Sequence, residues 1–316
     1  MTVAPQQTPS IPVAPRLGFD QTVPRALVHR HAVGEVLVTD SARVDEDRFV
    51  VAALLPRTHW YYTDRLDPAD RAVDPMLLLE ACRQACTVVA HRHLGVPMDT
   101  AFLVGRWTVE LPATDVPGPP SGELLLHLGT AGARVRHGQL SALSLSLDLD
   151  LAGHPLGRTE IDARYLRPED YRAMRELRRG GPPPMSDTRP AARSGRPLPP
   201  SEVGRTRPEN VLLVDAATTA AGVTARLDVP TGHASLYDHP LDHVPAMALL
   251  EAARQLAHHL VGPAGNGRLT TLSADFTRFA ELDEPVQVIG VPDDGRTRVE
   301  FRQSEQAICT VEVGLR

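Results

Sequence analysis

Apolar and polar residues alternate strictly in the segment SALSLSLDLDL, which predicts a strand with one buried face. Two other segments, LLLEACRQACTVVA and MALLEAARQLA, are apolar almost all round at helical spacing. They predict helices at about 75–93 and 245–261 that have little exposed surface. The remaining apolar runs predict strands at 49–56, 101–111, 122–128, 139–151 and 155–165 in the first half and at 223–230, 269–280, 285–291, 297–303 and 307–315 in the second.

The two halves carry the same signature, because Glu-Ala-x-Arg-Gln occurs at 80–84 and again at 251–255. Upstream of each helix, His59 recurs as His233 in the same order. Ordered matches across a loop and a helix indicate a tandem duplication. Because one buried helix gripped by an antiparallel sheet is the hot-dog arrangement, we expect an α+β tandem double hot-dog, with two antiparallel sheets that each wrap around a central helix.

Two segments rich in proline divide the chain into four parts. We expect a flexible tail at 1–20, a first hot-dog repeat at 21–179, a linker rich in Pro, Gly and Arg at 180–208, and a second repeat at 209–316. Unpaired sheet edges invite association, so the two repeats should pair edge to edge as an internal pseudo-dimer. Such a chain can exist as a monomer or as a homodimer.

Charge and cysteine content exclude several classes of protein. The formal net charge of −6 argues against nucleic-acid binding, which needs surplus positive charge. The sequence has no apolar run long enough to span a membrane and no secretory start, which predicts a cytoplasmic protein. Its three cysteines show no zinc spacing, and we expect neither a metal nor a cofactor.

Each predicted helix carries one carboxylate among apolar residues, Glu80 and Glu251, where an unpaired charge is costly. Burial raises the pKa of a carboxyl group and a nearby arginine lowers it, and the pattern does not decide between them. An arginine three residues later and a glutamine four residues later share the same helix face. The helix candidates are therefore Glu80, Glu251 and Arg254 for catalysis, and Arg83, Gln84 and Gln255 for substrate binding. The alternative is a structural Glu–Arg pair that pins each helix to its sheet.

Histidines supply the other candidates. His239 and His243 stand at the entrance to the second helix, where either could act as a general base, and His59 is a weaker candidate for substrate binding. Since only the second repeat has these loop histidines, we expect Glu251 and Arg254 to matter at least as much as their counterparts in the first. Histidines near the helix C-termini, where the dipole favours a charged ring, are interpreted as structural: His91, His93, His258 and His259.

Two resemblances follow from these motifs. The run from His239 to Ala252 resembles the His-to-Glu segment of hot-dog acyl-carrier-protein dehydratases. The full chain looks much more like the A-factor biosynthesis family, the γ-butyrolactone and butenolide autoregulator synthases with two hot-dog repeats. The matching segments are LVHR at 27–30, PRTH at 56–59, DPML running into EACRQ at 74–84, and the second-repeat run at 238–255.

The resemblance implies an acyltransferase that moves a β-ketoacyl group from acyl carrier protein to the hydroxyl of dihydroxyacetone phosphate, after which the ester cyclises to a butenolide phosphate. A helix carboxylate or a histidine can accept the hydroxyl proton, and arginine can hold a phosphate or an oxyanion. The alternatives are a hot-dog dehydratase or thioesterase that acts on acyl-carrier-protein thioesters, and a non-enzymatic module that binds an acyl chain or a lactone.

Overall fold

The structure is a computed structural model that describes residues 16–66, 72–113, 121–188, 193–262 and 267–316. Most of the predicted tail therefore lies outside the described residues. The helices are α1 (Pro75–Arg92), α2 (Pro168–Arg179) and α3 (Ala246–Val261). The strands of the first half are β1 (Val38–Arg43), β2 (Arg48–Leu54), β3 (Ala101–Glu110), β4 (Glu123–Arg136), β5 (Gln139–Leu151) and β6 (His154–Leu166). Those of the second half are β7 (Leu213–Thr219), β8 (Gly222–Leu227), β9 (Leu269–Phe276), β10 (Val286–Asp293), β11 (Arg296–Gln303) and β12 (Gln306–Leu315).

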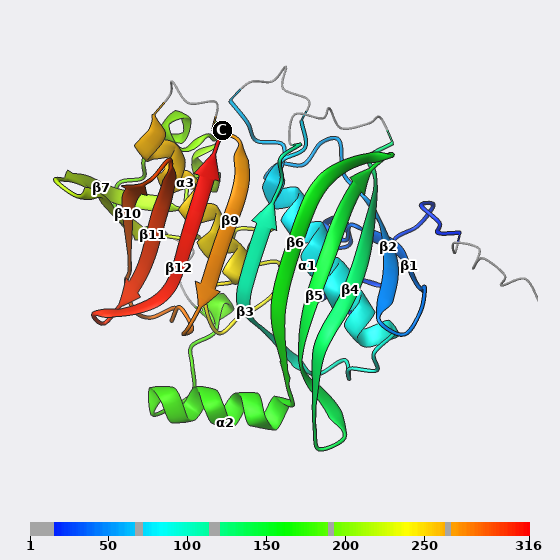
Figure 1. The fold of residues 1–316 in the computed structure, drawn as a ribbon. Helices are drawn as coiled ribbons and strands as arrows, with labels where there is room; N and C mark the ends of the chain where they lie inside the picture. Colours follow the sequence, from blue (N-terminus) through cyan, green and yellow to red (C-terminus); the bar gives the residue numbers. More distant parts are fainter. Residues whose placement is uncertain (1–15, 67–71, 114–120, 189–192, 263–266) are drawn as a thin grey trace, which may run out of the picture.

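All twelve strands form one antiparallel sheet in the order β1-β2-β4-β5-β6-β3-β9-β12-β11-β10-β8-β7 (Figure 1). The halves meet where β3 pairs with β9, with Trp107 opposite Ala274. The predicted pairing of the repeats edge to edge is therefore confirmed. The two sheets that we expected are halves of one continuous sheet, because β3 and β9 satisfy each other's backbone groups across the junction.

The two long helices α1 and α3 lie on the same face of this sheet (Figure 1). α1 begins where Asp74 accepts a hydrogen bond from the Met76 backbone N–H at 2.7 Å, and Pro75 occupies the first turn, where a missing N–H costs little. Most apolar residues of both helices are buried in a single core. No helix among the described residues is both long and apolar enough to cross a membrane.

Among the described helices and strands, β1, β7 and α2 were not predicted from the sequence. β1 and β7 are short outer strands of mixed polarity, which lack a regular alternation. α2 lies beside the end of the first half (Figure 1) and is anchored by Arg175, which is 1% exposed and binds Asp242 and Glu281 of the second half at 2.9 and 2.7 Å. This helix therefore fastens the first half to the loop that precedes α3.

Candidate active site

In the first half, Glu80 of α1 is fully buried and surrounded by donors. Its Oε1 lies 2.7 Å from Nη2 of Arg30 and 2.8 Å from Nη2 of Arg83, and its Oε2 accepts from Nε of Arg83 at 2.9 Å. Gln84 donates to Oε1 at 2.7 Å. We call Arg30, Glu80, Arg83 and Gln84 the first cluster.

The second half repeats this geometry on α3. Oε1 of Glu251, also fully buried, lies 2.8 Å from Nη2 of Arg205, and its Oε2 accepts from Nε of Arg254 at 2.9 Å. Gln255 donates to Oε1 at 2.7 Å. We call Arg205, Glu251, Arg254 and Gln255 the second cluster. The structure thus brings together the helix candidates of each repeat and adds to each cluster an arginine that was not among the candidate site residues.

The two glutamines anchor their helices to the segment that carries the extra arginine. The Gln84 amide accepts from the Leu37 backbone N–H at 2.8 Å and donates to the Glu35 carbonyl oxygen at 2.7 Å. The Gln255 amide accepts from the Leu212 backbone N–H at 2.8 Å and donates to the Asn210 carbonyl oxygen at 2.7 Å. Both glutamines therefore have structural partners on two sides, and a substrate-binding role for either stays a prediction.

Each added arginine follows a short 3-10 turn whose C-cap residue adopts a left-handed conformation. In the first half, η1 (Arg25–Val28) is capped by His29 with φ 52°, and Arg30 comes next. In the second half, η4 (Pro200–Val203) is capped by Gly204 with φ 74°, and Arg205 comes next. This repetition is a sequence signal that could have identified both arginines. We propose that the second repeat begins before Arg205, inside the segment expected to be linker.

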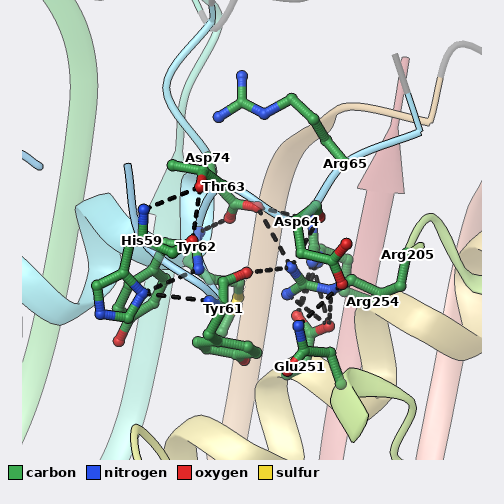
Figure 2. A network of polar contacts seen from close by, with 12 residues as sticks. His59, Tyr61, Tyr62, Thr63, Asp64, Arg65, Asp74, Arg205, Glu251 and Arg254 are labelled. Atoms are coloured by element: carbon green, nitrogen blue, oxygen red, sulfur yellow. Dashed lines mark hydrogen bonds and ion pairs between the residues drawn. The ribbon is translucent and has the colours of Figure 1, made fainter. Parts of the chain in front are cut away.

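The loops before α1 and α3 cross between the halves. Asp64 accepts from the backbone N–H of Thr206 at 3.0 Å and from the Asn210 side chain at 2.8 Å, and Arg205 donates to the Tyr61 carbonyl oxygen at 2.7 Å (Figure 2). Reciprocally, Asp238 accepts from two N–H groups, of His31 and Ala32, at 2.5 and 2.9 Å. Each cluster is therefore held in place by a loop of the other half.

Glu80 is a poor general base in this environment. Burial raises the pKa of its carboxyl group, but Arg30 and Arg83 outweigh burial and lower the pKa to about 2. The ionised carboxylate has both oxygens engaged and no exposed surface. Its geometry is that of an anchor that fixes the direction of two guanidinium groups.

The two clusters differ in how open they are. The Arg83 side chain is 27% exposed, and Glu80 is its one ion-pair partner among the described residues. Its Nη2 also donates to the Val28 carbonyl oxygen at 3.1 Å, and within the described part of the chain its Nη1 makes no hydrogen bond. The Arg254 side chain is 8% exposed and lies 3.6 Å from a second carboxylate, Asp74. The first cluster therefore presents the more accessible cation. The loop histidines had favoured the second repeat.

Gly204 and His258 make the second cluster still less accessible than the first. A Cβ atom on Gly204 would lie 3.2 Å from the His258 ring, so that ring occupies the space beside the second cluster. Burial, with the charges of Arg254 and Arg205, lowers the pKa of His258 to about 3. Burial and the two arginines therefore outweigh the helix dipole at this ring, and the structural interpretation of His258 stays a prediction.

Four imidazoles gather near the first cluster instead. His29 lies 2.8 Å from His91, nitrogen to nitrogen, and the ring centroids of His31 and His239 are 5.1 Å apart. His29 feels the charges of Arg83, His91 and His239. The candidate His239 thus crosses to the first cluster, and burial, opposed by Asp238, lowers its pKa.

The other histidine candidates have different surroundings. His243 lies 2.6 Å from Asp242, which belongs to the group that holds α2, and packs against Phe279. His59 lies 3.3 Å from Glu35 and caps the loop before α1 by accepting from the Tyr61 backbone N–H at 3.3 Å. These contacts orient loops, so a catalytic role for His243 or a substrate-binding role for His59 stays a prediction.

We expect the protein to lose stability progressively as the pH falls below 6.5. Burial, together with nearby charges, lowers the pKa of His29, His233 and His258 from 6.5 to about 3. Below pH 6.5 the unfolded chain binds protons at these positions and the folded chain does not, so protonation favours unfolding down to about pH 3. Glu80, with a folded pKa of about 2 against 4.5, adds a further loss between pH 4.5 and 2.

Thermal unfolding followed by circular dichroism from pH 8 to 4 tests this expectation. Tm should fall steadily from about pH 6.5, and His233→Gln should give a shallower dependence on pH than the parent chain. A constant Tm from pH 8 to 4.5 would contradict it.

The fold and the duplicated Glu-Arg-Gln helices define the class: a double hot-dog protein with two related charged clusters, one of which has a partly exposed arginine. The chain belongs to the A-factor biosynthesis hotdog domain family, whose model matches residues 14–167 and 186–315.

Individual relatives agree with this assignment. The chain is 32% identical to the 2-oxo-3-(phosphooxy)propyl 3-oxoalkanoate synthase of Streptomyces virginiae over 304 residues, which cover 93% of this chain and 98% of that one. It is 33% identical to the enzyme of the same name from Streptomyces coelicolor over 83% and 80% of the two chains. A structure from Lactobacillus plantarum with a provisional oleoyl thioesterase name superposes with a TM-score of 0.50 at 10% identity, over 85% and 96% of the two chains, which supports the fold alone.

Proposed function

We propose that this protein is a 2-oxo-3-(phosphooxy)propyl 3-oxoalkanoate synthase of γ-butyrolactone biosynthesis. It transfers a β-ketoacyl group from acyl carrier protein to the hydroxyl of dihydroxyacetone phosphate. Identity of about one third to synthases along nearly the whole chain is the observation that carries the assignment. The free, buried cysteines fit a protein that acts in the reducing cytoplasm.

The first cluster is the proposed reaction site. An acceptor that carries a phosphate needs a fixed, accessible cation, and Arg83 offers its Nη1 edge while Glu80 holds the rest of the guanidinium. His239 of the second half lies near His29 beside the first cluster, and its ring packs against that of His31 from the first half. The proposed site is therefore built from both halves. The two halves then work as one enzyme, an internal pseudo-dimer, with the second cluster acting as a structural copy.

The site chemistry separates this reaction from hydrolysis and dehydration. A synthase needs a bound hydroxyl acceptor next to the thioester, whereas a thioesterase activates water and a dehydratase removes a proton from the acyl chain. Arg83 supplies the acceptor subsite in our proposal. No covalent enzyme intermediate is required, because the acceptor hydroxyl attacks the thioester directly.

Release of the free thiol of acyl carrier protein tests the proposal. We expect a β-ketoacyl thioester to release thiol in the presence of dihydroxyacetone phosphate, and much more slowly without the acceptor or with glycerol in its place. Thiol release that does not depend on the acceptor would identify a thioesterase. Dehydration of a β-hydroxyacyl thioester would identify a dehydratase, and stoichiometric binding without product would identify a binding module.

A further inference from the structure

We propose that His29 is the catalytic base of the acyl transfer and that His91 is the residue that positions it. The proposal rests on the proposed function and deepens it, because it assigns the proton acceptor. The observations behind it are the contact between the two imidazoles, the backbone conformation of His29 and the different residue at the equivalent place in the second half.

The hydrogen bonds around the pair fix which nitrogen of His29 is free. Nδ1 of His91 lies 2.8 Å from the Val96 carbonyl oxygen, which can only accept, so His91 donates from Nδ1. With the His91 proton on Nδ1, Nε2 of His91 accepts from Nε2–H of His29 across 2.8 Å. The remaining nitrogen of His29, Nδ1, carries the lone pair. A histidine oriented in this way by a second group is an arrangement that suits a general base.

The backbone places this ring beside the accessible cation. His29 adopts a left-handed conformation with φ 52°, an uncommon one for a residue with a Cβ atom, and it immediately precedes Arg30 of the first cluster. Phe102 packs edge-on against the ring with centroids 4.8 Å apart, which limits its rotation. The ring therefore has a fixed orientation and lies close enough to Arg83 for the arginine charge to lower its pKa.

The ionisable groups that face His29 are Arg83, His91 and His239. Burial first, and then these charges, lower the pKa of His29 to about 3, so its ring is neutral when the site is empty. A phosphate dianion bound at Arg83 offsets the positive charge and moves the pKa of His29 upward, toward the range of an effective base. The base becomes stronger when the acceptor is bound.

The proposed step balances. Nδ1 of His29 takes the proton of the acceptor hydroxyl as its oxygen forms a bond to the thioester carbonyl carbon, which gives a tetrahedral oxyanion. The carbonyl re-forms, the C–S bond breaks, and the protonated ring returns its proton to the leaving thiolate. The products are the ester and the free thiol of acyl carrier protein, and His29 is neutral again.

The second half provides a matched control. The residue equivalent to His29 is Gly204, and the imidazole beside the second cluster comes instead from His258, on α3. The variant His29→Gly places in the first half the residue that the second half already has at a left-handed position, so it should fold. The variant His258→Asn removes the other imidazole.

We expect His29→Gly to lower kcat at least a hundredfold with KM for dihydroxyacetone phosphate changed less than threefold, as for the loss of a general base. Added imidazole should restore turnover in proportion to the concentration of its neutral form, because the variant leaves room for a free base. His258→Asn should stay within threefold of the parent. His91→Asn should lower kcat about tenfold, and the ¹⁵N shifts of His29 should change from one tautomer to a mixture.

The outcomes distinguish this proposal from the proposed function. A parent chain that forms no ester with any β-ketoacyl thioester overturns both. If the parent chain is active and the His29→Gly variant keeps kcat within threefold, the assignment of His29 as the base is overturned and the proposed function stands. The same holds if the variant has low turnover that imidazole does not restore. A large loss in His258→Asn with none in His29→Gly would move the base to the second cluster.

Discussion

Replacing Arg83 with methionine should reduce kcat/KM for ester formation about a thousandfold, within the range seen when a preorganised charge at a reaction site is removed. The reason is that Arg83 presents the accessible guanidinium edge of the first cluster, and methionine keeps the aliphatic stem without the charge. Folding should persist, because Glu80 keeps its ion pair with Arg30 and its hydrogen bond from Gln84. Steady-state kinetics with varied dihydroxyacetone phosphate measures the effect.

The matched variant is Arg254→Met in the second cluster. Arg254 is 8% exposed and is held by Glu251 and Asp74, so its loss should lower stability and leave turnover of the folded protein within about threefold. The reverse result, an inactive Arg254 variant beside an active Arg83 variant, would place the reaction in the second cluster.

Replacing Arg205 with methionine should lower the free energy of unfolding by about 3–5 kcal/mol, the usual cost of breaking a buried ion pair from one side. Arg205 is fully buried, lies 2.8 Å from Glu251 and donates to the carbonyl oxygens of Tyr61 and Asp64 at 2.7 and 3.1 Å. The substitution therefore leaves the Glu251 carboxylate short of one cation and removes bonds between the halves. Denaturant unfolding at constant pH gives the value.

Arg48→Met is the control for this measurement, because the Arg48–Asp45 pair lies on the surface with the two side chains 70% and 43% exposed. This substitution should leave the denaturant concentration at the midpoint of unfolding unchanged. Equal midpoints for the Arg205 and Arg48 variants would show that the second cluster contributes no more to stability than a surface pair.

Local patterning predicted the two central helices and most of the strands. The alternating segment SALSLSLDLDL lies within β5, whose ends match the strand expected at 139–151. The two apolar helices begin and end within about one residue of α1 and α3. α2 was missed because polar residues dominate it and its anchor, Arg175, finds its carboxylate partners in the second half. Contacts between distant segments leave no periodic trace in a sequence.

The site was predicted in part for the same reason. The Glu-Arg-Gln signature is local to one helix turn, so its spacing identified the helix members of both clusters. Arg30 and Arg205 come from turns far away in the chain, and Arg205 stood in a segment that looked like linker. His239 lies beside the first cluster because Asp238 binds the backbone of His31 and Ala32, a crossing between halves that spacing cannot reveal. The pKa of Glu80 depended on the number of arginines around it, which only the structure supplies.

Mass spectrometry of the reaction product tests the central claim most directly, namely that this chain joins a β-ketoacyl group to dihydroxyacetone phosphate at its first cluster. Purified protein is incubated with a β-ketoacyl carrier-protein thioester and dihydroxyacetone phosphate labelled with ¹³C. We predict a phosphorylated ester or butenolide that carries the label, formed by the parent chain and by Arg254→Met and nearly absent with Arg83→Met. Free β-keto acid as the sole acyl product, or labelled product at parental rates from the folded Arg83 variant, would contradict the claim.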